Sequence, residues 1–222
     1  MKQFNKSEIE NIIGYKFKDE NLLLQSFTHS SYAKENGAES YERIEYLGDS
    51  ALGFVVAMEL YRRFPQCDEG KLTRLRASLV SAKSLSAIID KTSLIEYMRL
   101  GKGEIQSSAL QSENVKCDLF EAIAGAILLD SSYNIEECRN FILKLLSDSI
   151  HDIEEGHVQP DYKSKLLEEC AKTNKMVEFR IQTNSSPFKV QLYIDNKFIA
   201  EAEGQTKKAA EKAAAKLYFS QK

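Results

Sequence analysis

Three carboxylates, Glu42, Glu45 and Asp49, lie in a segment that has the apolar spacing of a buried helix. Each residue of an α-helix advances by about 100°, so these three side chains fall within an arc of about 60°. The same face continues along the helix with the residues Gly53, Val56 and Leu60. Carboxylates on an apolar face repel one another and lose hydration, so they need a cation or protons to remain there.

A second segment, residues 117–129, repeats this pattern. It is apolar almost throughout except for Asp118 and Glu121, which share one helical face because they are three residues apart. Glycine within a helix costs about 1 kcal/mol relative to alanine, and close packing of two helices would justify it. Such glycines stand at Gly48, Gly53 and Gly125.

If the two helices cross at these glycines, four carboxylates converge: Glu45, Asp49, Asp118 and Glu121. With no sulfur and no imidazole in that set, the chemistry favours Mg²⁺ or Mn²⁺ over zinc. An acid pair on a helix is, however, most often part of a solvated surface, and each pair taken alone supports that alternative. The apolar surroundings of both pairs, and the repetition in one chain, favour a buried divalent-metal site.

The first acidic segment resembles the signature of bacterial ribonuclease III, in the nine residues Glu-Arg-Ile-Glu-Tyr-Leu-Gly-Asp-Ser at 42–50. The segment Phe27–Tyr32 is similar to the family's sequence before that signature. Further similar segments follow in the family's order, at residues 75–81, 100–103 and 118–122. The tail from Asp161 is similar to a double-stranded-RNA-binding domain, so the resemblance covers nearly the whole chain.

This resemblance implies an all-helical endonuclease domain followed by a small α-β-β-β-α domain. It also implies an enzyme that cuts double-stranded RNA as a homodimer using Mg²⁺, for which Mn²⁺ can substitute. By position, the family's metal ligands correspond to Glu45, Asp49, Asp118 and Glu121, of which Asp49 and Glu121 occupy the positions called catalytic. All of these acids are present, so an active enzyme is expected.

Three further positions follow from the same resemblance. Glu42 and Glu69 match acids that assist cleavage, and Glu69 lies in the family's RNA-binding valley. Tyr46 stands where many members carry Phe, an aromatic side chain that contacts the partner subunit. The tyrosine hydroxyl would need a polar partner or water at such an interface.

The composition is that of an ordinary globular protein, with 43% hydrophobic and 28% charged residues in 222. No apolar stretch approaches the roughly 18 residues of a membrane span, and the first residues lack the apolar core of a signal peptide. The four cysteines show no paired spacing, which favours reduced thiols and a cytoplasmic protein. The three histidines are scattered and are expected to be structural or exposed.

The net charge of −3 hides an uneven distribution. Residues 1–158 hold 18 Lys and Arg against 25 Asp and Glu, or −7, whereas residues 159–222 hold 12 against 8, or +4. The pattern predicts a helical catalytic domain over residues 1–153, a linker over 154–160 and an RNA-binding domain over 161–222. An acidic catalytic domain and a basic tail fit a division of labour in which the tail attracts phosphate.

In the tail, helices are expected over 162–173 and 207–219, with strands over 177–183, 188–194 and 198–202. The polar residues 101–114 are expected to form a loop or a frayed helix end. Thr206 is expected to cap the last helix, which opens with Lys207 and Lys208.

RNA-binding domains of this type bind A-form RNA through the first helix, the loop between the first two strands, and the start of the last helix. The last contact is retained in the lysine pair, which Lys212 on a neighbouring turn can join. The loop at residues 184–187 is short, and Leu167 stands where many members carry Gln. Ser164 and Glu168 remain as the matching polar contacts of the first helix. The alternative is a folded spacer with a merely basic face.

The resulting interpretation is Mg²⁺-dependent hydrolysis of double-stranded RNA in rRNA and mRNA processing, giving staggered ends with 5′ phosphates and 3′ hydroxyls. Two other function classes remain open at this point. A non-cleaving RNA-binding protein gains nothing from acids near phosphates, and a nuclease for structured DNA is distinguished by a 2′-deoxy substrate.

Overall fold

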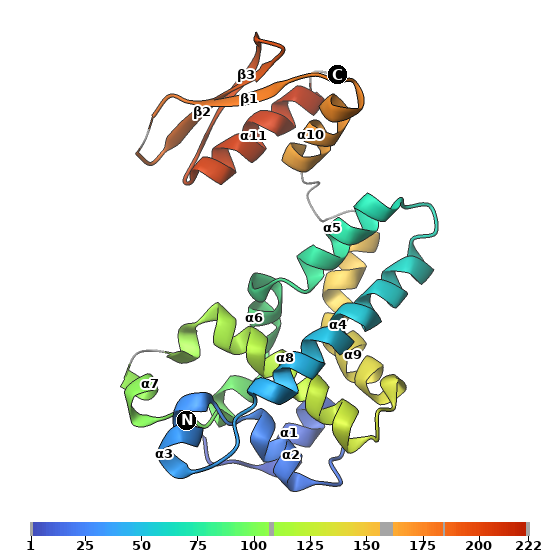
Figure 1. Cartoon of the computed structure of the whole chain (residues 1–222), viewed down its shortest axis with the longest axis vertical. Helices are drawn as coiled ribbons and strands as arrows, with labels where there is room; N and C mark the ends of the chain where they lie inside the picture. Colours follow the sequence, from blue (N-terminus) through green and yellow to red (C-terminus); the bar gives the residue numbers. More distant parts are fainter. Residues whose placement is uncertain (1, 107–108, 156–161, 184, 221–222) are drawn as a thin grey trace. The chain divides into compact units, whose positions relative to one another are not determined.

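The computed structural model describes residues 2–106, 109–155, 162–183 and 185–220 (Figure 1). The chain divides into two compact units, Met1–Glu155 and Gly156–Lys222. The linker predicted over residues 154–160 lies outside the described residues from Gly156 onward. Each unit is considered by itself.

The first unit is built from helices along the whole of its described length. Their bounds are α1 Lys6–Ile13, α2 Glu20–Ser26, α3 Ser30–Asn36, α4 Glu42–Arg63, α5 Glu69–Leu79, α6 Ala82–Asp90, η1 Leu94–Tyr97, α7 Lys102–Gln106, η2 Ala109–Gln111, α8 Glu113–Asp130 and α9 Ile135–Glu154. The loop expected over 101–114 is therefore wrong in part, because α7 and η2 are short helices there. A single turn needs few apolar residues, so periodicity does not reveal it.

Local sequence explains where the main helices begin and end. The α4 helix stops at Arg63, two residues before Pro65, which cannot continue a helix. The Asp68 carboxylate caps α5 by accepting a hydrogen bond from the backbone N–H of Lys71 at 2.7 Å. The Asn134 side chain caps α9 in the same way, accepting from the backbone N–H of Glu136 at 3.1 Å.

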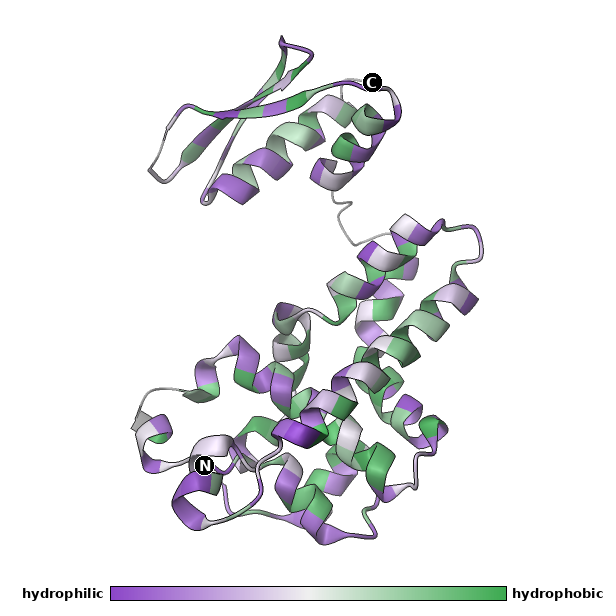
Figure 2. Cartoon of the chain, viewed as in Figure 1, coloured by the Kyte–Doolittle hydropathy of each residue, from purple (hydrophilic) through white to green (hydrophobic). Residues whose placement is uncertain are grey.

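The central helix of this unit is α8, which packs along α4 and is buried from Lys116 to Leu128 except at the half-buried Asp118. Its run of Ala, Ile, Leu and Phe explains this, since a helix that is apolar all round must lie inside a core. Figure 2 shows the hydrophobic residues gathered where the helices pack against each other. Each fully buried large aliphatic or aromatic side chain stabilises the unit by about 1.5–3 kcal/mol relative to an exposed one.

The second unit has the predicted element order, with α10 Tyr162–Lys172, β1 Val177–Ile181, β2 Phe188–Ile194, β3 Lys197–Gly204 and α11 Lys207–Ser220. The strands form an antiparallel sheet in the order β1-β2-β3, and α11 packs against β2 and β3. Asp195 and Asn196 make the turn between β2 and β3 with positive φ angles of 48° and 61°, which Asp and Asn tolerate. The core lies between the helices and the sheet, at Leu166, Cys170, Leu192, Ile194, Ala214 and Ala215.

The fold class expected from the sequence is confirmed in both units. Among the described residues, no helix combines the length and apolar character that crossing a membrane requires.

Candidate active site

The candidate site lies where α4 and α8 cross at two glycines. A Cβ atom added to Gly48 would lie 1.8 Å from the carbonyl oxygen of Glu121, and one added to Gly125 would lie 2.1 Å from the carbonyl oxygen of Ile44. No larger residue fits at either position without moving the backbone, which confirms the close crossing predicted for this pair. The expectation is wrong for Gly53, where an added Cβ would meet no atom within 4 Å.

This crossing brings together carboxylates that are about 70 residues apart in the sequence. From α4 come Glu45, which is half-buried, and Asp49, which is exposed; from α8 come Asp118, half-buried, and Glu121, only 9% exposed. Burial, followed by repulsion from Asp118 and two nearby acids of α4, raises the pKa of Glu45 to about 7. Burial and repulsion from Asp49 likewise raise the pKa of Glu121 to about 7. The cluster therefore holds negative charge only at a cost in free energy.

The charge of this cluster is not neutralised by the protein itself. Within the described residues, no lysine or arginine forms an ion pair with Glu45, Asp118 or Glu121. Partly buried carboxylates without a cation fit a divalent metal ion, and their oxygen atoms suit hard cations such as Mg²⁺ or Mn²⁺. The residues present thus fit a divalent cation, although Glu45 and Asp49 do not belong to the group of ligand atoms that lie within 4.8 Å of one another in the described residues.

Two residues that sequence reasoning did not single out hold Asp118 in place. The Tyr41 hydroxyl, 3% exposed as a residue, donates a hydrogen bond to Oδ2 of Asp118 at 3.3 Å. The His29 ring packs edge-on against Tyr41, with 5.8 Å between ring centroids. Burial raises the pKa of Asp118, while the hydrogen bond from Tyr41 and the charge of His29 partly oppose that rise. No spacing rule could have found this contact, because 77 residues separate Tyr41 from Asp118.

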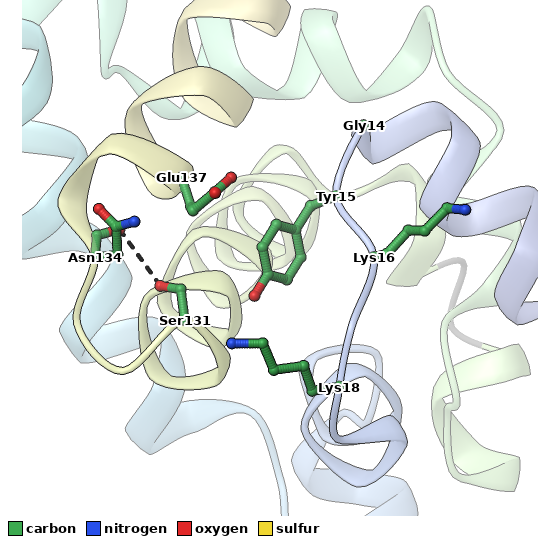
Figure 3. Close-up of a pocket in the computed structure, with 7 residues that line it drawn as sticks. All are labelled: Gly14, Tyr15, Lys16, Lys18, Ser131, Asn134 and Glu137. Atoms are coloured by element: carbon green, nitrogen blue, oxygen red, sulfur yellow. Dashed lines mark hydrogen bonds between the residues drawn. The ribbon is translucent and has the colours of Figure 1, made fainter.

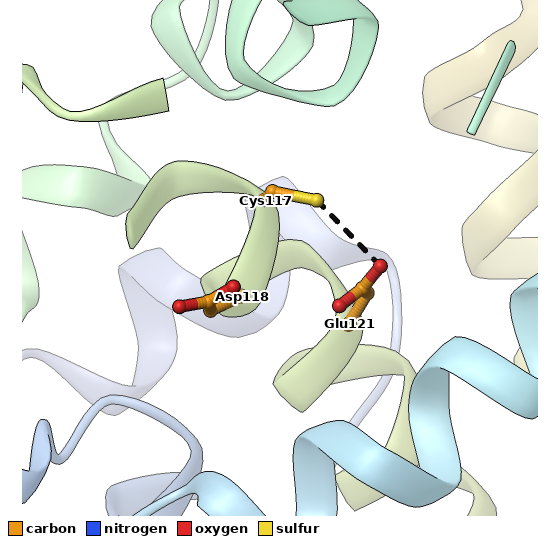
Figure 4. A group of neighbouring side chains, drawn as sticks. All are labelled: Cys117, Asp118 and Glu121. Carbon is orange, nitrogen blue, oxygen red and sulfur yellow. Dashed lines mark hydrogen bonds between the residues drawn. The ribbon is translucent and has the colours of Figure 1, made fainter. Parts of the chain in front are cut away.

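A thiol lies beside the carboxylates, a contact that the sequence analysis did not single out. Cys117 lies one turn before Glu121, and its Sγ donates a hydrogen bond to Oε1 of Glu121 at 3.6 Å (Figure 4). Burial and the neighbouring carboxylates raise the pKa of this thiol. The i, i+4 spacing of Cys117 and Glu121 was visible in the sequence and would have predicted the contact.

The other acids named from the sequence lie at different distances from this cluster. Glu42 opens α4 beside Glu45, adds to its electrostatic repulsion and accepts a hydrogen bond from the Ser40 hydroxyl at 3.2 Å. Glu69 is exposed in the first turn of α5, which begins beyond the far end of α4 (Figure 1). That end is about 20 Å along the helix from Asp49, so a single chain does not bring Glu69 to the cluster.

Exposed apolar side chains form a stripe along α4, where Tyr46 is 77% exposed. Phe54, Met58 and Tyr61 follow at 55%, 37% and 76% exposure. At 100° per residue the four side chains fall within an arc of about 120°, so they share one side of the helix. Exposed apolar side chains on one side of a helix are typical of surfaces that contact another protein.

In the second unit, Lys207, Lys208 and Lys212 are all exposed on α11. The predicted cap of that helix is confirmed, because the backbone N–H of Ala209 donates to Oγ1 of Thr206 at 3.1 Å. On α10, Ser164 is half-buried and Glu168 is exposed. Leu167 is 42% exposed on the same helix, and the first residue of the short loop at 184–187 lies outside the described residues.

A separate cavity of about 340 Å³ lies between the start of α9 and the segment that joins α1 to α2, lined by Gly14, Tyr15, Lys16, Lys18, Ser131, Asn134 and Glu137 (Figure 3). Behind it, the buried Asp130 accepts a hydrogen bond from the Tyr15 hydroxyl at 2.7 Å. It also accepts two from the backbone N–H groups of residues 18 and 19. Through these hydrogen bonds, Asp130 holds residues 15–19 against the end of α8, and it is not part of the acid cluster.

Comparison with known proteins places both units in known families. A family model described as "Ribonuclease-III-like" matches residues 19–150, and one described as "Double-stranded RNA binding motif" matches residues 162–221. A protein named Ribonuclease 3 from Symbiobacterium thermophilum is 36% identical to the chain, and the alignment covers 92% of this chain and 88% of that protein. Another protein of that name, from Leptospira interrogans, is 38% identical, and the alignment covers 93% of this chain and 86% of that protein. The solved nuclease domain of ribonuclease III from Campylobacter jejuni, in a study of the region involved in its dimer formation, is 33% identical with a TM-score of 0.61; it matches 65% of this chain and 97% of that domain.

Proposed function

The chain belongs to the ribonuclease III family of endoribonucleases, with a double-stranded-RNA-binding domain, and on that premise we propose that it hydrolyses double-stranded RNA with the help of Mg²⁺. The products are staggered duplex ends with 5′ phosphates and 3′ hydroxyls, and the physiological role is processing of rRNA and mRNA precursors. The observation that carries this proposal is the set of partly buried carboxylates at the α4–α8 crossing, whose pKa values are raised and with which no lysine or arginine of the described residues forms an ion pair.

The residues of this cluster have two roles in binding a metal ion: four of them would be ligands and one orients a ligand. Glu45, Asp49, Asp118 and Glu121 supply the carboxylate oxygens, and Mn²⁺ can take the place of Mg²⁺. A bound ion of this kind lowers the pKa of a water molecule and stabilises the charge that develops on the leaving 3′ oxygen. Tyr41 fixes the orientation of Asp118 through its hydroxyl, so that this ligand does not have to be ordered when the ion binds.

Asp49 and Glu121 are assigned the catalytic role by their match to the family's catalytic positions, and the charge of Asp49 contributes to the raised pKa of Glu121. Glu42 and Glu69 are assigned an assisting role. Glu42 stands beside Glu45, whereas Glu69 requires another route to the substrate, because it lies beyond the far end of α4 in its own chain.

In a homodimer, Glu69 of one subunit could reach substrate bound at the acid cluster of the other subunit. The apolar stripe on α4, from Tyr46 to Tyr61, is the surface we assign to the partner subunit. Two acid clusters on one duplex would then cut both strands. Truncation of a buried aromatic anchor commonly costs about 2 kcal/mol or more of binding free energy, so Tyr46→Ala should shift sedimentation toward the monomer. A wild-type monomer at micromolar concentration would contradict the dimer.

The second unit supplies affinity for the duplex. Lys207 and Lys208 are exposed at the N-terminal end of α11, where the helix dipole adds to their attraction for phosphate. Lys212 joins them, with Ser164 and Glu168 as polar contacts on α10. Duplex RNA presents mainly its shape, phosphates and 2′-hydroxyls, so this contact selects the A-form helix with little sequence preference.

The four free cysteines fit a reducing compartment, and we assign the protein to the cytoplasm.

The test of this function is cleavage of an end-labelled RNA duplex of about 30 base pairs, nearly twice the span of about 16 base pairs that one RNA-binding domain covers. Metal-free protein is compared with protein in Mg²⁺, on the RNA duplex and on the same sequence as DNA. Cleavage of RNA alone, and only with Mg²⁺, is the expected result. Tight binding without cleavage would support a duplex-binding protein instead, and equal cleavage of DNA would point to a nuclease without RNA selectivity.

A further inference from the structure

The acid cluster includes one ligand that Mg²⁺ does not use, the thiol of Cys117. The ligand atoms of Cys117, Asp118 and Glu121 all lie within 4.8 Å of one another (Figure 4). Cys117 and Glu121 are each 9% exposed, so the thiol faces the carboxylate inside the protein. Thiolate is a soft ligand that binds Zn²⁺ and its heavier relatives, whereas Mg²⁺ takes oxygen ligands.

The spacing of these atoms suits a tetrahedral ion. Zinc binds sulfur at about 2.3 Å and carboxylate oxygen at about 2.1 Å, so the tetrahedral angle separates the two ligand atoms by about 3.6 Å. Sγ of Cys117 and Oε1 of Glu121 are 3.6 Å apart. A zinc ion could therefore bridge these two atoms without movement of the helix backbone.

The second observation concerns Glu121 itself. As a residue it is only 9% exposed, and within the described residues the Cys117 thiol is its single hydrogen-bond donor. A buried carboxylate is normally satisfied by a cation or by N–H and O–H donors. The weak S–H donor leaves most of that requirement to water or to a cation from solution.

The other buried thiol of this unit lacks such surroundings. Cys138 is fully buried on α9, and its Sγ donates to the backbone carbonyl of Ala124 at 3.4 Å. Cys67 is half-buried and lies just before α5. Within the described part of the chain, the group at Cys117 is the one set of thiol and carboxylate ligands close enough to hold a metal ion.

We propose that Cys117, Asp118 and Glu121 form a binding site for thiophilic divalent cations such as Zn²⁺ and Cd²⁺, which overlaps the Mg²⁺ site. On binding, the thiol releases its proton to solvent and the sulfur bonds the cation. The overlap rests on the proposed function, whereas binding of the soft cation does not. Zn²⁺ then inhibits RNA cleavage by occupying Asp118 and Glu121.

The experiment titrates metal-free full-length protein with Cd²⁺ in the absence of RNA and follows the ultraviolet charge-transfer absorption of a cadmium–thiolate bond. We expect a saturable band that corresponds to one thiolate per chain. Cys117→Ala and Cys117→Ser should both lose it, while Cys67→Ala and Cys138→Ala should keep it as matched controls. Circular dichroism verifies that each variant is folded. A band of wild-type size in both folded Cys117 variants would overturn the proposal.

Two further arms test the carboxylates and the overlap. Glu121→Gln retains the thiol but removes a direct ligand, so Cd²⁺ affinity should fall by at least about tenfold, the lower end of what loss of an outer-shell partner costs. Unchanged affinity would overturn the three-ligand site. Excess Mg²⁺ should shift the Cd²⁺ titration to higher concentration, and a titration that does not move would overturn the overlap.

These readouts separate the two proposals. If the cadmium band forms as expected but no RNA is cleaved in Mg²⁺, the proposed function fails and the soft-cation site stands. If Mg²⁺-dependent cleavage occurs but the band does not depend on Cys117, this further inference alone fails.

Discussion

Buried carboxylates near the two ends of α4 have opposite electrostatic surroundings. Near its C-terminal end, the Glu59 side chain is 3% exposed and forms ion pairs with Arg62, Arg63 and Arg139. Burial would raise the pKa of Glu59, but the hydrogen bonds from these three arginines outweigh it and lower the pKa to about 2. At the other end, Glu45 and the neighbouring Glu121 of α8 are also partly removed from water, but no arginine or lysine of the described residues pairs with them. The weak hydrogen bond from Cys117 does not outweigh burial at Glu121, and the pKa of both carboxylates rises to about 7.

The difference shows that burial alone does not decide what a carboxylate does. The Glu59 cluster is electrostatically complete, and it joins α4 to α9 through Arg139. The acid cluster is incomplete without a cation from solution, which is a property of sites that bind metals or transfer protons. A structural role follows for the first cluster and a chemical role for the second.

The largest expected effect comes from removing one charge of the incomplete cluster. Glu121→Gln should lower the cleavage rate in Mg²⁺ by about a thousandfold or more, because a metal ion contributes several kcal/mol to stabilising the transition state. The metal-free variant should be at least as stable as the wild type, since repulsion within the cluster is relieved. Single-turnover cleavage and thermal unfolding measure the two effects, and wild-type cleavage would rule out the assignment of Glu121.

The helix crossing can be broken with a matched pair of glycine substitutions. Gly48→Ala forces a Cβ to within 1.8 Å of the Glu121 backbone, whereas Gly53→Ala places one in open space on the same helix. We expect the first to lose about 3 kcal/mol or more of stability and most cleavage. The second should gain up to about 1 kcal/mol from helix propensity. Urea unfolding checks both, and equal stabilities would show that α4 and α8 do not cross here.

A substitution in the Glu59 cluster should lower the stability of the protein and leave the cleavage reaction intact. Glu59→Gln leaves three arginines without their shared carboxylate and should cost about 1–3 kcal/mol, less than for a fully buried pair because the arginines are 30–66% exposed. Cleavage per folded molecule at low temperature should remain. A variant as stable as wild type but inactive would reverse the roles given to the two clusters.

The smallest expected effect is on how stability depends on pH: in metal-free protein, Glu59 and Glu121 should contribute to it in opposite directions. Glu59 has a lowered pKa, so its contribution to stability is present above pH 4.5 and is lost as the pH falls toward 2. Glu121 has a raised pKa, so the folded state binds its proton more tightly and the protein loses stability as the pH rises from 4.5 to about 7.

Urea unfolding across a pH series, with the two Gln variants as references, measures each contribution as a difference from the wild type. The Glu59→Gln difference should grow with rising pH in the acid range. The Glu121→Gln difference should change sign in favour of the variant near neutrality. Parallel curves for the two variants would remove the distinction between the clusters.

Much of this protein is determined by local sequence. The strand β2 spans the residues that alternation predicts, and the helix after Thr206 begins where its cap predicts, because side-chain periodicity and capping act over a few residues. The acid pairs and Gly48 with Gly125 likewise predicted a crossing of two helices, since glycine lowers the stability of a buried helix unless another backbone approaches it closely.

Local spacing places Arg62 and Arg63 beside Glu59, but tertiary structure decided which charges find partners on other helices. Glu59 carries the same charge as Glu45 on the same helix, but Arg139 reaches it from 80 residues away, and no spacing within α4 encodes that approach. In the same way, the fold brings Tyr41 to Asp118, leaves Gly53 facing open space and places Glu69 beyond the far end of α4. The physical reason is that the faces of a helix follow from local periodicity, whereas what each face meets depends on how distant helices pack around a shared core.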